Sequence, residues 1–130
     1  MIILTLRTDN PTAEIGIYND ATQLTYYTWQ AHRELAETLH LTLQEQLQAQ
    51  SLSLNDVQGI VVFKGPGSFT GLRIGLTVAN ALAESQATPI VGTMGDDWVE
   101  QGINRLLNQQ SDEIVTPEYG ALPHITAPRK

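Results

Sequence analysis

The stretch at residues 57–83 reads VQGIVVFKGPGSFTGLRIGLTVANALA, and its pattern predicts a strand, a tight turn and a helix. Apolar residues crowd positions 57 to 63, which is typical of a strand that is covered on both faces. The turn that follows, KGPGSFT, holds two glycines and a serine able to cap the first amides of a helix. We therefore expect a central strand, followed by a helix that begins near Thr70.

This helix, expected from about residue 70 to 86, carries small residues at every fourth position: Gly71, Gly75, Ala79 and Ala83. Such a low ridge lets another element approach the helix backbone closely. Larger apolar residues cover most of the remaining circumference, so the helix needs more than one neighbour. Two alternatives follow: the helix is buried entirely in its own core, or the ridge is offered to a second protein.

The segments on either side predict a mixed α/β sheet with helices packed on it. Strands are expected from their β-branched and aromatic residues at 2–6, 13–18, 22–30, 57–63 and 89–91. Helices are expected at 31–50, 70–86 and 94–108. The fold class is therefore a five-stranded mixed sheet in the order βββαβαβ, with a last helix.

We expect residues 1–108 to form one lobe and residues 109–130 an extended tail. A chain of 130 residues fits one domain and is long enough to bury a core. The tail starts with a polar run, and its later prolines forbid a long helix. It should lie along its own lobe or a neighbour, anchored by Ile114, Tyr119 and Ile125.

The composition excludes several classes of site. The chain has no cysteine, so a disulfide framework, a cysteine zinc site and a thiol nucleophile are all absent. Its opening MIILTL is too short for a signal segment or a membrane span, so we expect a soluble cytoplasmic protein. Fourteen acidic against seven basic residues give a formal net charge of −7, which is unfavourable for holding nucleic acid alone.

The turn before the ridge helix is the best candidate for ligand binding. Lys64, Gly65, Gly67 and Ser68 stand at a helix start, where exposed amides attract anions, although simple turn chemistry explains the same residues. Thr70 occupies the place of the third glycine of a dinucleotide fingerprint, and no P-loop is present.

Catalytic patterns are also missing elsewhere. His32 and His40 are eight residues apart, which does not match the zinc-binding histidine pair of a metalloprotease. No pair of acidic side chains stands out as an acid–base pair.

Residues 65–75, GPGSFTGLRIG, resemble the signature of the TsaB family, also called YeaZ, a bacterial subunit of the machinery that makes threonylcarbamoyladenosine in tRNA. The order of elements is similar over residues 1 to about 100. The resemblance implies a lobe of the actin-like ATPase, ribonuclease-H-like type. It also implies that the helices at 31–50 and 70–86 pack against those of the catalytic paralogue TsaD. The interface residues expected on this basis are Leu35, Leu39, Gly71, Leu72, Gly75, Leu76 and Ala79.

The chain departs from the family pattern at several places. The family's opening strand commonly ends in Asp-Thr-Ser, whereas this chain has Arg7, Thr8 and Asp9. The usual His-Ser-Glu becomes His32-Arg33-Glu34. In the closing Pro-x-Tyr-x-Arg-x-Pro motif at 117–123, Ala121 replaces the arginine. Family members have a second lobe, so we expect a compact form that lacks most of it.

The resulting hypothesis is a non-catalytic scaffold subunit that dimerises with a TsaD-like catalytic subunit. A TsaE-like ATPase belongs to the same expected complex, and the chain alone is expected to form a homodimer. The isolated chain should bind no cofactor, while ADP or ATP at the subunit interface stays open. The alternative is a nucleotide-dependent transferase or hydrolase whose site forms at an oligomer interface. A metallopeptidase ranks third, because the histidine pair of the catalytic paralogue is missing.

The charge yields a first prediction. The isolated chain should bind tRNA weakly or not at all, because its net charge of −7 opposes contact with phosphates. A gel-shift titration with tRNA at modest salt measures this. Tight binding that weakens steeply with salt would show that the chain itself holds the RNA.

Overall fold

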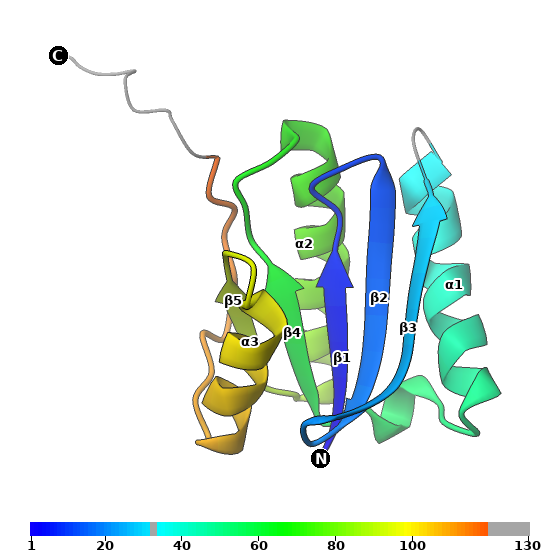
Figure 1. The fold of residues 1–130 in the computed structure, drawn as a ribbon, viewed down its shortest axis with the longest axis vertical. Helices are drawn as coiled ribbons and strands as arrows, with labels where there is room; N and C mark the ends of the chain where they lie inside the picture. Colours follow the sequence, from blue (N-terminus) through cyan, green and yellow to red (C-terminus); the bar gives the residue numbers. More distant parts are fainter. Residues whose placement is uncertain (32–33, 120–130) are drawn as a thin grey trace, which may run out of the picture.

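The computed structural model describes residues 1–31 and 34–119, and it shows a five-stranded sheet in the order β3-β2-β1-β4-β5 (Figure 1). The strands are β1 (Ile2–Arg7), β2 (Thr12–Asn19), β3 (Thr22–Gln30), β4 (Gly59–Phe63) and β5 (Ile90–Thr93). The helices are α1 (Leu35–Ala49), the 3-10 turn η2 (Leu54–Asp56), α2 (Phe69–Gln86) and α3 (Trp98–Leu107). The predicted mixed sheet with packed helices is confirmed.

Strand β1 lies at the centre of the sheet, antiparallel to β2 and parallel to β4. Helices α1 and α2 cover one face, and α3 covers the other face over β4 and β5 (Figure 1). Alternate residues of β1 therefore enter different cores: Leu4 and Leu6 pack beneath α1 and α2, and Ile3 packs beneath α3. Every residue of β4 is buried, as its continuous apolar run predicts.

Two tyrosines cover the part of the second face that α3 does not reach. Gly16 leaves room for them, because a Cβ there would lie 2.8 Å from the ring of Tyr18 and 3.1 Å from that of Tyr26. The hydroxyl of Tyr26 donates to Glu14 at 2.5 Å. Burial raises the pKa of Tyr18, and burial together with the Glu14 carboxylate raises that of Tyr26. The rings of Tyr18 and Tyr26 thus cover this part of the sheet, and their hydroxyls stay protonated.

Two helices begin later than the sequence predicts. The N–H of Ala31 bonds to the carbonyl of Pro11, so this residue still belongs to the sheet end, and α1 begins at Leu35. Gly95 has a φ of +93°, and α3 begins at Trp98 after this turn. Residues 32 and 33, which with Glu34 replace the family's usual His-Ser-Glu, lie outside the described part of the chain.

Residues 109–119 run along β5 and α2 without forming a helix or strand. The N–H of Asp112 donates to the carbonyl of Ile90 at 2.7 Å, and its carboxylate accepts from the N–H of Gly92 at 2.8 Å and the guanidinium of Arg105 at 2.5 Å. Tyr119 stacks on Phe69, with ring centroids 4.8 Å apart.

The prediction that Ile114 anchors the tail is wrong. Its side chain is 69% exposed, whereas Val115 is 4% exposed and enters the core. Asn80 holds Val115 through two bonds of 2.9 Å to its backbone N–H and carbonyl, and this fixes which of the two neighbours faces inward. Ile125 lies outside the described residues, and the division into a lobe of 1–108 and a tail of 109–130 stays a prediction.

The Arg105–Asp112 pair leads to a pH-dependent prediction. The guanidinium of Arg105 lowers the pKa of Asp112, so its stabilising effect is full at neutral pH and is lost as the pH falls through the native pKa. Asp112→Asn should lower the free energy of unfolding by about 1 kcal/mol at neutral pH, and by less in acid, where the wild type is protonated too.

Urea unfolding at neutral and acidic pH measures both values. Asp96→Asn is the matched control, because this exposed carboxylate makes no hydrogen bond in the described structure, and it should change little. An equal loss for Asp112→Asn at both pH values would show that the charge of the pair is unimportant.

Candidate functional site

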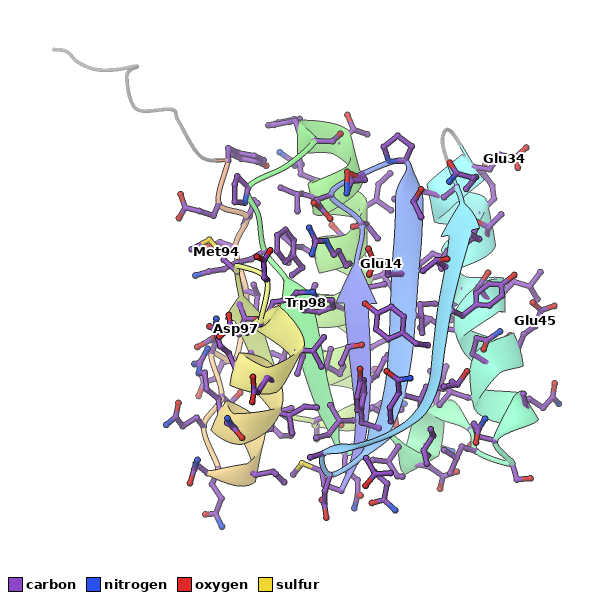
Figure 2. All side chains as sticks on the ribbon, viewed as in Figure 1. Glu14, Glu34, Glu45, Met94, Asp97 and Trp98 are labelled. Carbon is purple, nitrogen blue, oxygen red and sulfur yellow. The ribbon has the colours of Figure 1, made fainter. Side chains whose placement is uncertain are left out.

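The ends of β1 and β4 meet beside the loop that precedes α2. The guanidinium of Arg7 lies 3.8 Å from the ring centroid of Phe63 and bonds to the carboxylate of Asp9 at 2.7 and 3.1 Å. Trp98 lies at the start of α3 (Figure 2), and its ring is nearly perpendicular to that of Phe63, with ring centroids 5.8 Å apart. The pKa of Arg7 is raised, mainly by its bond to Asp9. The cation at this strand end is therefore neutralised within the chain.

The candidate anion contacts serve the turn itself. The N–H of Ser68 donates to the carbonyl of Asp9 at 3.0 Å, and the Ser68 hydroxyl accepts from the N–H of Gly71 at 3.5 Å. Gly65 has a φ of +131°, and a Cβ at Gly67 would overlap Asp9, so both positions require glycine for close packing. These contacts favour the alternative of turn chemistry.

The side chain of Lys64 lies beside β5. Its Cδ is 3.1 Å from where a Cβ of Gly92 would stand, and its ammonium contributes to the lowered pKa of Asp112. Within residues 1–31 and 34–119, no group of three His, Asp or Glu side chains is placed to hold a metal ion. In the same part of the chain, no helix is long and apolar enough to cross a membrane.

The small-residue ridge of α2 faces the chain's own sheet. The Thr8 hydroxyl donates to the carbonyl of Gly71 at 2.8 Å, and a Cβ at Gly75 would overlap this hydroxyl. Ala79 and Ala83 are 1% and 4% exposed in the core beneath the helices. The hypothesis that the ridge is offered to a partner is therefore wrong, because Thr8, directly after β1, already makes the close approach.

The residues expected at the interface share this inward orientation. All except the half-buried Gly71 are buried within the chain: Leu35, Leu39, Leu72, Gly75, Leu76 and Ala79. The inward leucines belong to two cores, since each helix turns its most continuous apolar stripe inward. Leu72 lies in the core with α3, and the core beneath α1 and α2 holds Leu35, Leu39, Leu43, Leu47 and Leu76. The expected helices are still the candidate elements, but the surface must lie on their other sides.

An apolar groove runs between the exposed sides of α1 and α2. Its lining residues, which we call the α1–α2 groove, are Ala36, Phe69, Thr70, Arg73, Ile74, Thr77 and Val78. Phe69 is 58% exposed, and the guanidinium of Arg73 lies 5.3 Å from its ring centroid. Arg73 is the one charged residue of this lining. The groove can therefore accept an apolar partner surface that carries a carboxylate near Arg73.

Sequence reasoning missed this second apolar stripe of α2. Ile74 and Val78 lie four residues apart on the outer side, and both are half-buried. The signal was the apolar character of the helix on nearly all sides, which allows two stripes. The larger residues of the outer stripe mark the surface, whereas the glycines mark the contact with the sheet.

The sequence of this chain is similar to a protein-family model and to known proteins. The family model described as TsaD, tRNA N6-adenosine threonylcarbamoyltransferase, matches residues 29–94. The tRNA threonylcarbamoyladenosine biosynthesis protein TsaB of Escherichia coli (strain K12) is 30% identical over 92% of this chain and 55% of that protein. The tRNA N6-adenosine threonylcarbamoyltransferase of Geotalea uraniireducens (strain Rf4) is 42% identical over 65% of this chain and 24% of that protein.

A solved structure gives the same indication for the fold. YeaZ from Pseudomonas aeruginosa matches with a TM-score of 0.67 and 24% identity over 78% of this chain and 50% of that protein. The fold that the resemblance implied, a mixed five-stranded sheet with helices packed on it, is thereby confirmed. The chain spans about half the length of its TsaB and YeaZ relatives.

Because the small-residue ridge faces the sheet, one added methyl group on it should lower the stability of the fold. Gly75→Ala should lower the free energy of unfolding by about 1–3 kcal/mol, because the new Cβ overlaps Thr8 in the packed core. The overlap must outweigh the gain of roughly 1 kcal/mol that alanine brings to a helix interior.

Thr77→Ala is the control on the exposed side of the same helix, and it should be neutral or slightly stabilising. Urea unfolding of both variants measures the difference. If Gly75→Ala is as stable as Thr77→Ala, the ridge does not pack on β1.

Proposed function

The chain belongs to the TsaB (YeaZ) family, and from this premise we propose that it is a non-catalytic scaffold subunit of the machinery that makes threonylcarbamoyladenosine in tRNA. Its proposed partner is a TsaD-like catalytic subunit. The observation that carries the proposal is the apolar α1–α2 groove, because it runs along the long helix α2 beside Ala36 of α1 and carries only one charge.

The groove is lined by side chains spaced for packing against another helix. The row concerned lies on the outer side of α2, opposite the small-residue ridge. Ile74 and Val78 form a ridge four residues apart along α2, and such ridges fit between those of a facing helix. Phe69 is held at one end by Tyr119 and Arg73, so this aromatic anchor is already ordered before binding. We therefore propose that the partner docks its own helices across α1 and α2.

The strand-end loops support a role without catalysis. Asp9 is paired with Arg7, and the Ser68 hydroxyl caps α2, so these polar groups of the described chain already hold one another. We propose that ADP or ATP in the complex binds where the subunits meet, since the Lys64 side chain lies beside Gly92 of β5 and acts on Asp112. A TsaE-like ATPase as a further member and a homodimer of the free chain belong to the same proposal.

Two added charges in the groove should prevent assembly. Ala36 and Thr77 are exposed lining residues on α1 and α2, and Ala36→Glu with Thr77→Glu would bury two carboxylates against an apolar partner. Affinity for the TsaD protein of the same organism should fall by about 30-fold or more. Calorimetric titration measures the affinity, and thermal melting checks that the variant is folded.

The matched control is Gln44→Glu with Gln48→Glu, which adds the same charge on an exposed part of α1 outside the groove. It should bind like the wild type and restore threonylcarbamoyladenosine to the tRNA of depleted cells, as measured by mass spectrometry of nucleosides. A groove variant that binds and restores equally well would refute the proposal.

A further inference from the structure

The chain reaches one end of the α1–α2 groove at residues 118 and 119. The N–H of Glu118 donates to the carbonyl of Lys64 at 2.7 Å, and a Cβ at Gly65 would overlap the carbonyl oxygen of Glu118. The ring of Tyr119 stacks on Phe69, which lines the groove, with ring centroids 4.8 Å apart. The segment that follows Tyr119 therefore starts from a fixed point beside the groove.

Apolar residues recur at every third position from Tyr119 onward. We call them the tail stripe, and they are Tyr119, Leu122, Ile125 and Pro128. A polyproline II helix has three residues per turn, so the four side chains share one side of such a helix. Pro123 and Pro128 fix their own backbone angle near that conformation, and Pro123 disfavours a helical backbone at Leu122. The sequence of this segment therefore favours an extended form with one apolar side.

We propose that residues 120–130 dock in the α1–α2 groove of their own chain as a polyproline II segment. Proline-containing segments of this form bind grooves that are lined by aromatic side chains, and Phe69 supplies an exposed ring here. Tyr119 already contacts this ring, so the first member of the tail stripe lies at the groove. The other members then continue along α2.

The length of the segment matches the length of the helix. At about 3.1 Å per residue, the tail stripe spans roughly 28 Å from Tyr119 to Pro128. Helix α2 has 18 residues and is about 27 Å long. A segment that starts over Phe69, the first residue of α2, therefore reaches the last turn of this helix.

The spacing of the tail stripe also places its apolar members on apolar residues of α2. Leu122 is about 9 Å beyond the stacked rings, and Ile74 is about 8 Å along the helix from the same point. Ile125 is about 19 Å beyond the rings, between Val78 at about 14 Å and Leu82 at about 20 Å. The three α2 residues are half-buried and packed against the core, so docking would remove their remaining apolar surface from water.

The charges of the segment complement those at the far end of α2. Residues 120–130 include Arg129 and Lys130 and no acidic residue, whereas the whole chain has a net charge of −7. Glu84 is exposed in the last turn of α2, and this turn contains no basic residue to balance the negative end of the helix dipole. Because the two basic residues directly follow Pro128, the docked segment places them beside this turn.

The docked segment covers the surface that the proposed partner would contact. The docking itself does not depend on the proposed function, whereas the competition with a TsaD-like partner rests on it. That partner must displace residues 120–130 before it contacts Ile74 and Val78, so its measured affinity falls in proportion to the fraction of chains whose groove is free. The segment thereby regulates assembly.

Methyl NMR of the free chain tests the docking. Leu122→Asp with Ile125→Asp, which we call the stripe variant, should release the segment, because docking would bury two carboxylates against an apolar surface. The methyl signals of Ile74 and Val78 should therefore shift relative to those of the wild type. The shifts should be the same in dilute and concentrated samples, because the segment and the groove belong to one chain.

His124→Asp with Thr126→Asp is the matched control, because it adds the same charge to the same segment away from the tail stripe. It should leave the signals of Ile74 and Val78 as they are in the wild type. Signals that stay unchanged in the stripe variant, or that shift equally in the control, overturn the docking.

Crosslinking tests the register of the docked segment. The chain has no cysteine, so Thr77→Cys with Leu122→Cys should form a disulfide within one chain on oxidation. Thr77→Cys with Ala121→Cys is the control, and it should oxidise about fivefold more slowly, because Ala121 lies off the tail stripe. Equal rates would show that the segment meets the helix in no fixed register, and disulfide-linked dimers would show that it reaches a neighbouring copy. Either result overturns the proposal.

Calorimetric titration with a TsaD protein tests the competition. The stripe variant should bind about threefold or more tightly than its matched control, because its groove is free. Equal affinities would refute the competition. If the signals of Ile74 and Val78 respond as expected but neither variant binds the TsaD protein, the proposed function fails and the docking stands.

Discussion

The contact between Thr8 and the backbone of α2 determines which side chains of α2 are buried and which line the groove. The Thr8 hydroxyl donates to the carbonyl of Gly71, and the missing side chain of Gly75 gives that hydroxyl its space. This packing fixes the rotation of α2 about its axis. Leu72 and Leu76 consequently enter the two cores, while Ile74, Val78 and the exposed Phe69 line the groove.

The same close packing explains why the polar groups at the strand ends bond to one another and are less free to bind a ligand. Gly67 lets Asp9 lie against the loop before α2, where the Asp9 carbonyl accepts from the N–H of Ser68 and its carboxylate holds Arg7. Phe63 and Trp98 cover the guanidinium from the sheet and α3. A buried or half-buried polar group that is satisfied in this way stabilises the loop arrangement and is less available for a substrate.

Hydrophobic periodicity was sufficient to predict the order of strands and helices, because the strands are buried between the helices and each helix buries one side against the sheet. It could not predict how α2 is rotated, since Leu72 and Leu76 on one side and Ile74 and Val78 on the other are equally apolar. The glycines were recognised as a site of close approach, but the group that approaches them is Thr8, directly after β1. In the tail, no period distinguishes Ile114 from Val115, and the bonds from Asn80 decide between them.

Methyl NMR of the chain titrated with a TsaD protein, the partner proposed above, tests the rotation of α2 most directly. The methyl signals of Ile74 and Val78 should shift or broaden on binding, because these side chains line the groove. The signals of Leu72 and Leu76 should stay nearly unchanged, because both side chains are buried within the chain. Large shifts at Leu72 and Leu76, with none at Ile74 and Val78, would contradict it.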